Sequence, residues 1–395
     1  MYILVSTVAA AAMYRIVTTS YRPVKSTSYV PVCAVSKDKT YLCNQVIKYT
    51  PSIPDMLEKW NYEPCQSDLR KWVAWFIFYN REEYLLGNQE YENCVKMLTT
   101  ACENELLDDY VKNTISVQEE LLYMKSYKLP FFYKYLNSFF HLRFSYRMKY
   151  SGFSDPISLK YGRCWIKFGG DRTVVFIHGL GFGIWPYETF IKKLDQQLSG
   201  DCTIVCIEFD HLIASWSDKC PKRGEVAKDV LSAMDYAGAT SAVFVGHSFG
   251  TAKIAQVYSE APHAVEGMVL MAPVCLIPHC LDSTFNFIFK GRSSYNIFHR
   301  TMAYDNTIIN TINCTWWHKT TLWPDELRDV PIMVVLAEHD QLISTNILEQ
   351  HILDNFQLRS GNRELMIVKG KHGAMVFNND SIHQVCKNTK LMFFS

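Results

Sequence analysis

A serine enclosed by two glycines is the residue of this chain best suited to covalent chemistry. It stands in the motif GHSFG over 246–250, which fits the pattern G-x-S-x-G. An apolar strand is predicted before the motif over 242–245, and a helix after it over 251–259. On a sharp strand-to-helix turn, small flanking residues avoid clashes and the hydroxyl is raised above the edge of a sheet. Ser248 is therefore the predicted nucleophile.

An acid and a base follow the serine, each just after a predicted strand. Asp340 ends the sequence AEHD, which follows the strand predicted over 332–336. His372 lies in the sequence KGKHG, which follows the strand predicted over 365–368. The chain order Ser, Asp, His is that of one large class of serine hydrolases. In that arrangement His372 would take the proton from Ser248, and Asp340 would hold the imidazole tautomer.

Other residues compete for these two roles. His339 and His383 are alternatives for the base, and Glu338 and Asp282 are alternatives for the acid. Neither of these histidines combines a preceding strand end with a glycine-flanked loop. The base and the acid named above therefore remain the leading predictions.

A second glycine-containing loop could hold the oxyanion that forms when a nucleophile attacks an acyl group. The sequence HGLG over 178–181 follows a strand predicted over 173–177. Acyl chemistry needs backbone N–H donors aimed at the developing negative charge. The predicted donors are the N–H groups of Leu180 and Phe249, and the glycines would let the loop come close. His178 is interpreted as a structural residue.

The elements that must position these residues form an alternating pattern after residue 152. Short β-branched runs alternate with helical stretches such as 223–236. Continuous apolar strands separated by helices predict an α/β fold with a mostly parallel central sheet and helices on both faces. The predicted strands are 164–168, 173–177, 203–207, 242–245, 268–271, 332–336 and 365–368.

The sequences HGLG, GHSFG, AEHD and KGKHG together resemble the α/β-hydrolase superfamily over residues 163–395. The resemblance implies an α/β-hydrolase fold and serine hydrolysis without a cofactor. A serine at position 248 argues against the branches that use an aspartate nucleophile. Esterases, lipases, thioesterases, acyltransferases and some receptors share this fold, so the fold alone does not define the reaction.

The segment 274–326 separates two predicted core strands, where a lid commonly sits in this superfamily. Its aromatic residues could cover the serine and favour an acyl chain, or could be ordinary packing residues. They are Phe285, Phe287, Phe289, Tyr295, Phe298, Tyr304, Trp316, Trp317 and Trp323. The sequences FNF over 285–287, WW over 316–317 and LWPDE over 322–326 are similar to poorly characterised fungal and algal α/β-hydrolases with an N-terminal helical extension. Those proteins often have Pro-His after the fourth strand, where this chain has FDH over 209–211.

The N-terminal end has the character of a short membrane segment. Residues 1–14 carry no charged side chain, and basic residues follow from Arg15 onward. A spanning helix needs ~20 apolar residues, and a cleaved signal normally begins with a positive segment. A short membrane anchor over 1–20, with the catalytic domain on the cytosolic side, is the leading prediction. A cleaved signal and a soluble or disordered tail remain alternatives.

Composition divides the rest of the chain. Scattered prolines without a sustained period predict a linker over 21–54. Residues 55–150 are predicted to form a helical extension, 151–273 and 327–395 the two parts of the hydrolase core, and 274–326 the lid insertion.

Three segments of the predicted extension are distinctive. The apolar run 72–79 predicts a buried helix, and 91–111 predicts an amphipathic surface helix. The segment 129–150 interleaves aromatic with basic residues. Such a mixture is typical of a membrane–water interface, and a helix packed on the main domain is the alternative.

Composition also excludes several classes of protein. Hydrophobic residues make up 48% of the chain, which excludes an intrinsically disordered protein. Lys+Arg 40 against Asp+Glu 39 leave a net charge of +1, which gives no bulk attraction to nucleic acid. The 13 cysteines show no zinc-ligand spacing, and their odd number favours a reducing compartment.

The sequence therefore predicts a membrane-associated serine hydrolase that cleaves a lipid-like carboxylic ester through an acyl-enzyme. An acyltransferase or thioesterase using the same site is one alternative. A catalytically silent binding protein of the same fold is another. No cofactor, metal or nucleic acid is expected, and the oligomeric state is left open.

Overall fold

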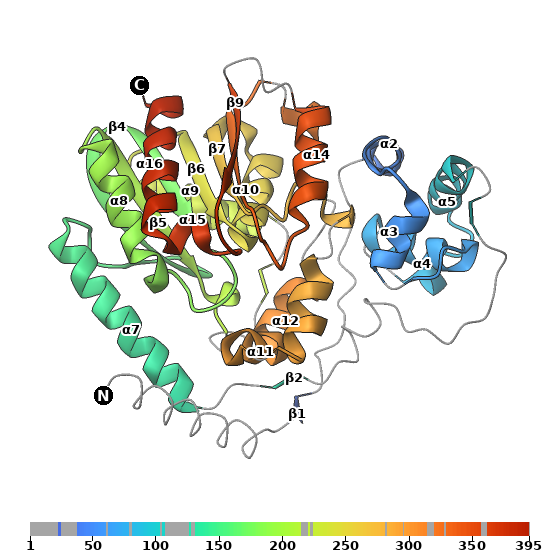
Figure 1. Cartoon of the computed structure of the whole chain (residues 1–395), viewed down its shortest axis with the longest axis horizontal. Helices are drawn as coiled ribbons and strands as arrows, with labels where there is room; N and C mark the ends of the chain where they lie inside the picture. Colours follow the sequence, from blue (N-terminus) through green and yellow to red (C-terminus); the bar gives the residue numbers. More distant parts are fainter. Residues whose placement is uncertain are drawn as a thin grey trace.

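A computed structural model shows a large α/β body with a group of helices beside it (Figure 1). The predicted anchor over 1–20 lies outside the described residues, as do Asp282, Tyr295, Trp316 and Trp317. The described residues are 23–24, 38–60, 62–78, 81–102, 105–106, 126–127, 131–214, 220–221, 224–280, 283–294, 296–313, 320–327, 329–356 and 362–394.

A seven-stranded sheet forms the centre of the α/β body in the described part of the chain. Pairing is parallel from β4 through β6, β7 and β8 to β9. Every residue of β5, β6 and β8 is buried, as expected for strands covered on both faces. The strands are β3 (Ile157–Ser158), β4 (Gly162–Ile177), β5 (Cys202–Phe209), β6 (Ala242–His247), β7 (Val265–Met271), β8 (Ile332–Ala337) and β9 (Arg363–Val368).

β4 changes direction near Gly169, so it contains both strands that the sequence predicts there. Before this point the pairing with β5 is antiparallel, with Lys167 opposite Ile204. After it, residues 173–177 lie opposite residues 203–207 and run in the same direction. β5 therefore lies between the two halves of β4, and the second half delivers the loop that follows residue 177 to the middle of the sheet.

Helices cover both faces of the sheet, which confirms the predicted α/β-hydrolase fold. Figure 1 shows α8 and α16 in front of the sheet, with α9 and α10 behind it. α8 packs against α16, and α9 packs against α10. These helices and their neighbours are α8 (Glu188–Leu198), α9 (Glu225–Tyr236), α10 (Phe249–Glu260), α14 (Thr345–Asn355), α15 (Ala374–Phe377) and α16 (Asn379–Phe393).

The chain leaves the sheet between β7 and β8, where the sequence predicts an insertion. The Leu322 N–H donates a 2.8 Å hydrogen bond to the Cys275 carbonyl, so the two ends of this segment are tied together. Its described elements are η5 (Pro278–Cys280), η6 (Phe285–Lys290), α11 (Ile297–Tyr304), α12 (Asn306–Asn313) and η7 (Pro324–Leu327).

The predicted linker over 21–54 is wrong where α2 begins. The Asp38 side chain caps this helix by accepting a 2.9 Å hydrogen bond from the Thr40 N–H. Its apolar face is narrow, because only Leu42, Cys43 and Val46 are buried aliphatic or thiol side chains within the helix. Lys and Thr residues surround these three side chains, so the sequence shows no clear helical repeat of apolar residues here. The helices of this region are α2 (Lys39–Tyr49), α3 (Ile53–Lys59), α4 (Gln66–Phe76), η1 (Glu82–Tyr84), α5 (Gln89–Ala101) and α7 (Phe131–Tyr150).

The buried helix predicted over 72–79 is confirmed as the second half of α4, with Trp72 and Val73 fully buried. The amphipathic helix predicted from residue 91 is α5, which ends at Ala101 rather than 111. β1 (Pro23–Val24) and β2 (Ser126–Tyr127) form a separate antiparallel pair. No helix in the described ranges is long and apolar enough to cross a bilayer.

The helices α2 to α5 dock on both ends of the insertion. The indole Nε1–H of Trp60 donates a 2.9 Å hydrogen bond to the His279 carbonyl in η5. At the other end, Tyr49 stacks on Trp323 and Lys48 lies 2.7 Å from the Asp325 carboxylate. The segment LWPDE is therefore in direct contact with α2, which precedes the helical extension predicted over 55–150.

The His279 side chain is fully buried at this docking surface, and burial lowers its pKa to about 3. In the unfolded chain His279 would bind a proton below about pH 6.5. The free energy of unfolding should therefore fall as the pH falls below that value. One such histidine lowers the free energy of unfolding by at most about 1.4 kcal/mol per pH unit. Urea unfolding at about pH 7 and about pH 5 should show a smaller acid-dependent loss for His279→Phe than for the unsubstituted chain.

His383→Gln is the matched control, because His383 is exposed on α16 and its loss should leave the pH dependence unchanged. Burial raises the pKa of Glu208 to about 7, which works in the opposite direction between about pH 7 and 4.5. That contribution is present in all three proteins and cancels in the comparison. An unchanged acid-dependent loss in His279→Phe would contradict this account.

Candidate active site

Ser248 lies on the turn between β6 and α10, in a backbone conformation that few non-glycine residues adopt. Its φ is 53° and its ψ is −121°. A Cβ at Gly246 would lie 2.6 Å from Ile254 Cδ1, and one at Gly250 would lie 2.4 Å from the Ile177 carbonyl oxygen. At Gly250 the close atom belongs to the backbone and cannot give way, which explains the glycine there, whereas at Gly246 the close atom is the end of a side chain. The strain at the serine, about 1–3 kcal/mol, must be offset by its surroundings.

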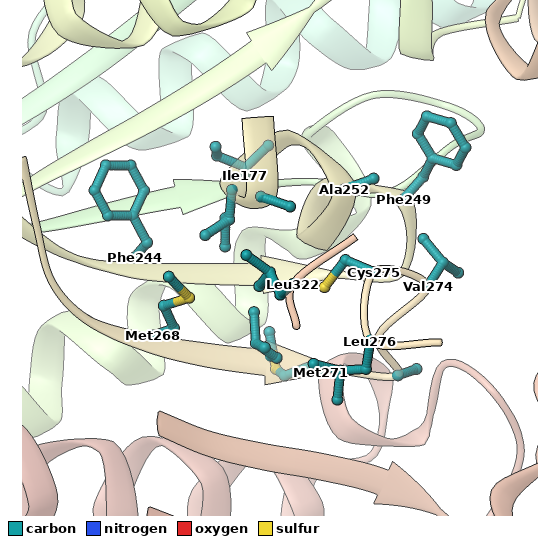
Figure 2. Packing of buried hydrophobic residues seen from close by; sticks show 14 of the residues in the cluster. Ile177, Phe244, Phe249, Ala252, Met268, Met271, Val274, Cys275, Leu276 and Leu322 are labelled. Atoms are coloured by element: carbon teal, nitrogen blue, oxygen red, sulfur yellow. The ribbon is translucent and has the colours of Figure 1, made fainter. Parts of the chain in front are cut away.

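Hydrogen bonds and packing hold this turn. The Ser248 N–H donates to the Met271 carbonyl over 2.8 Å, and the Thr251 hydroxyl donates to the Ser248 carbonyl over 2.6 Å. Thr251 Oγ1 in turn accepts a bond from the Val274 N–H at 3.1 Å. Figure 2 shows the apolar side chains beneath the turn, which come from β4, α10 and β7 and include Ile177, Ala252 and Met271.

The three side chains predicted to act together form one hydrogen-bonded chain. His372 Nε2 lies 2.9 Å from Ser248 Oγ, and His372 Nδ1 lies 2.7 Å from Asp340 Oδ2. Asp340 directly follows β8, and His372 follows β9, so adjacent parallel strands bring the pair to the same edge of the sheet. This arrangement can move a proton from the serine hydroxyl to the imidazole while the carboxylate fixes the imidazole tautomer.

Asp340 is held in its ionised form. Its side chain is only 2% exposed, and burial alone would raise its pKa. The charge and the hydrogen bond of His372 outweigh burial, and Oδ1 accepts further bonds from the Leu342 and Ile343 N–H groups. The net effect lowers the pKa of Asp340 below its ordinary value. The carboxylate therefore stays negative at neutral pH, as an imidazole partner requires.

The loop that follows β4 passes directly against the serine turn. A Cβ at Gly179 would lie 3.0 Å from the His247 carbonyl oxygen and 3.1 Å from Ser248 Cβ, so the absence of a side chain favours this close approach. Leu180 and Phe249 line the same cavity as Ser248. His178 is fully buried, with Nδ1 2.7 Å from the Gly179 carbonyl and Nε2 accepting from the Phe209 N–H. These two bonds support its interpretation as a structural residue.

A buried network around His247 was not predicted from the sequence. The Tyr187 hydroxyl lies 2.9 Å from His247 Nδ1 and accepts a 3.2 Å bond from the Gly179 N–H. His247 Nε2 lies 3.2 Å from the His372 carbonyl. Burial lowers the pKa of His247 to about 3, so the ring is neutral and can donate at one nitrogen and accept at the other. The network joins the Gly179 loop, the serine turn and the His372 loop.

Three of the four competing candidates have exposed side chains. The His339 side chain is 74% exposed, Glu338 is 49% exposed, and His383 is exposed on α16. Asp282 lies outside the described residues. No group of three or more His, Cys, Asp or Glu side chains in the described ranges is arranged to hold a metal ion.

A cavity of about 400 Å³ opens in front of Ser248 and His372. Among the described residues that line it, none is Asp, Glu, Lys or Arg. The insertion contributes apolar side chains to this wall, including Phe287, Met302 and Ile312. The cavity therefore suits an apolar or neutral polar group beside the serine.

The aromatic residues of the insertion divide between the two alternatives, lining the cavity and ordinary packing. Phe287 lines the cavity, whereas Phe285 and Phe289 stack on each other. Trp323 is fully buried against Tyr49 of α2, away from the serine. Its ring is covered by Tyr49 of α2 and His279 of η5, so it packs the N-terminal helices against the insertion.

Comparison with known proteins agrees with this geometry. Residues 172–296 match the family described as alpha/beta hydrolase fold, a region that includes the serine turn but ends before Asp340 and His372. The chain is 33% identical over 121 residues to the dihydrolipoyllysine-residue acetyltransferase component of the acetoin cleaving system of Cupriavidus necator. That match covers 30% of this chain and 30% of the bacterial protein, well short of its full length.

Solved structures of similar shape include two carboxylesterases of Bacillus subtilis. Naproxen esterase is 14% identical, with a TM-score of 0.45 over 66% of this chain and 98% of that one. CesB is 14% identical, with a TM-score of 0.42 over 66% of this chain and 99% of that one. A bacterial membrane phospholipase A is 13% identical, with a TM-score of 0.44 over 65% of this chain and 90% of that one. The match to the family model and the helix-covered parallel sheet show an α/β-hydrolase fold. The likeness to fungal and algal members stays a prediction.

Tyr187→Phe should destabilise the protein, because it removes a hydroxyl that serves two buried groups at once. The Gly179 N–H and His247 Nδ1 would both lose their partner, which should lower the free energy of unfolding by about 1–3 kcal/mol. Tyr236→Phe is the control, since Tyr236 is 55% exposed and its change should stay within about 0.5 kcal/mol. Urea unfolding measures both. Equal stability of the two variants would show that the network contributes nothing.

Proposed function

We propose that this protein is a serine hydrolase that cleaves a neutral, lipid-like carboxylic ester. The observation that carries the proposal is the hydrogen-bonded chain Ser248–His372–Asp340, with 2.9 Å and 2.7 Å contacts, on a strained turn that faces a cavity. A binding protein would gain nothing from a strained serine, a tautomer-fixing carboxylate and a base in hydrogen-bond contact.

The reaction would begin when His372 Nε2 accepts the proton of Ser248 as Oγ attacks the ester carbonyl carbon. The carbonyl oxygen becomes an oxyanion, and the N–H groups of Leu180 and Phe249 would hold it. The protonated imidazole then gives its proton to the leaving alcohol as the C–O bond breaks. An acyl-serine remains, and water activated by the same imidazole releases the acid and restores the serine.

The cavity supports the choice of substrate. Its described lining has no charged side chain, and apolar residues from the insertion form much of its wall. A charged group placed there would lose its hydration without gaining a partner. The same acyl-serine could pass its acyl group to an alcohol, or could form from a thioester. A product assay with added alcohol separates acyl transfer from hydrolysis.

Ser248→Ala should abolish ester turnover and labelling by a fluorophosphonate, because the probe needs an activated serine oxygen. Asp340→Asn should retain the serine but lower kcat by about 10⁴, since the wrong imidazole tautomer would face it. Intact mass reports labelling and a chromogenic ester reports turnover. Ser283→Ala is the matched control, because Ser283 lines the same cavity and should label as the unsubstituted chain does.

Labelling that persists in folded Ser248→Ala would refute the assignment of the nucleophile. Absence of labelling in the unsubstituted, folded protein would instead favour a catalytically silent binding protein. Thermal unfolding of each variant must therefore accompany the labelling.

Charge on the acyl chain should be strongly disfavoured. The kcat/KM for the p-nitrophenyl monoester of succinate should fall at least about 100-fold below that for p-nitrophenyl butyrate, because the described lining of the cavity includes no Lys or Arg. Gln341→Lys should narrow this ratio, since Gln341 is an exposed lining residue. Gln350→Lys, on the solvent side of α14, should leave the ratio unchanged. Equal kcat/KM values for the two esters would refute the proposed selectivity.

A further inference from the structure

α7 has a buried face and an opposite, exposed face. The residues of its buried face recur at helical spacing and pack on the α/β body: Tyr133, Asn137, His141, Phe144 and Met148. At 100° per residue, the side chains half a turn away form a second row on the outside. We call this row the outer ridge, and it consists of Phe139, Leu142, Tyr146 and Tyr150.

The outer ridge is apolar and open to solvent. Phe139 is 60% exposed, Leu142 is 72% exposed and Tyr150 is 78% exposed. The rings of Tyr146 and Tyr150 lie 4.9 Å apart, so the row is continuous at this end. An amphipathic helix on a protein surface normally turns its polar side to water. Here the exposed side is built from the residue types that proteins usually bury.

The charge on α7 has one sign. Its sequence, FFYKYLNSFFHLRFSYRMKY, contains no Asp or Glu. Two of its cations have acidic neighbours: Arg147 lies 2.7 Å from Glu188, and Lys149 lies 2.8 Å from Asp155. Lys134 and Arg143 are exposed. At 100° per residue, Lys134 and Lys149 lie on one side of the outer ridge. Arg143 and Arg147 lie on its other side.

Apolar residues flanked on both sides by cations match the surface of an anionic bilayer. Aromatic rings and Leu enter the boundary between headgroups and acyl chains, while Lys and Arg reach the phosphates. A protein partner fits less well, because protein interfaces are depleted of Lys around their centre. We propose that the outer ridge of α7 binds α7, lengthwise, to the surface of an anionic lipid bilayer.

The inner face of α7 links this surface to the cavity. The rings of Tyr133 and Phe182 lie 5.9 Å apart, and Phe182 lines the cavity. The Trp185 Nε1–H donates a 2.9 Å bond to Asn137, and the Trp185 ring stacks on Phe140. A bilayer bound to the ridge would therefore lie on the other side of the helix that supports one cavity wall. The binding itself does not depend on the proposed reaction.

The test uses the full chain carrying Ser248→Ala, so that no vesicle lipid can be hydrolysed. Co-sedimentation is measured with phosphatidylcholine vesicles that contain or lack phosphatidylserine. The ridge variant Phe139→Ser, Leu142→Ser, Tyr146→Ser should lower the partition coefficient for anionic vesicles at least about tenfold. The control variant Tyr236→Ser, Leu353→Ser, Leu391→Ser removes three apolar side chains that are each more than half exposed on α9, α14 and α16, and should bind unchanged.

A second measurement reports on α7 itself, because another segment could bring the chain to the vesicles. An environment-sensitive thiol dye is placed at Leu142→Cys or, as control, at Leu353→Cys, and the signal of the unsubstituted chain is subtracted. Anionic vesicles should shift the emission of the dye at 142 to the blue and leave the dye at 353 unchanged. This readout does not require enzymatic activity, so its failure is distinct from failure of the proposed reaction.

Three outcomes would overturn the proposal. Sedimentation without a shift at 142 would mean that a different segment binds lipid. Equal binding to vesicles with and without phosphatidylserine would mean that the cations beside the ridge are irrelevant. A dimer that the ridge variant converts to monomer, with no vesicle binding, would mean that a second copy of the chain covers this face.

Discussion

The rest of the site depends on the close approach of two backbone segments at the serine turn. Gly250 at the start of α10 lies against the carbonyls that end β4, so no side chain fits between them. This contact brings the Gly179 loop beside the serine and fixes the position of the first turn of α10. The unusual φ of Ser248 follows, because the chain must turn within one residue from a buried strand to a helix that faces it. The conformation persists because strands on both sides and Thr251 hold it.

Neutral histidines extend this rigidity beyond the serine. His247 stays uncharged because it is buried, and a neutral imidazole can accept a hydrogen bond from the Tyr187 hydroxyl while donating one to the His372 carbonyl. His372, the proposed base, is thus held twice, through its side chain by Asp340 and through its backbone carbonyl by His247, which precedes the proposed nucleophile. A catalytic group held from two directions needs little rearrangement when substrate arrives.

Three residues of the site could be predicted from short sequence patterns that follow predicted strands. Ser248, Asp340 and His372 each follow an apolar strand, and parallel strands deliver such residues to one edge of a sheet. Tyr187 could not be predicted this way, because no short sequence pattern marks it. Its partner His247 lies 60 residues away in the chain. For Trp323 and the other aromatic residues of the insertion, the sequence left open whether they cover the serine or pack elsewhere. Neighbours from the N-terminal helices cover Trp323, and the sequence around it does not reveal such a distant contact.

The docking of Trp60 on the His279 carbonyl also has a consequence for how the protein is made. The two residues are separated by 219 positions, so α3 leaves the ribosome long before its docking surface exists. At usual rates of synthesis the delay is on the order of ten seconds or more. During that time the nascent chain presents the apolar underside of α2 to α4 without its partner. Docking of the N-terminal helices must therefore wait until the insertion has been synthesised.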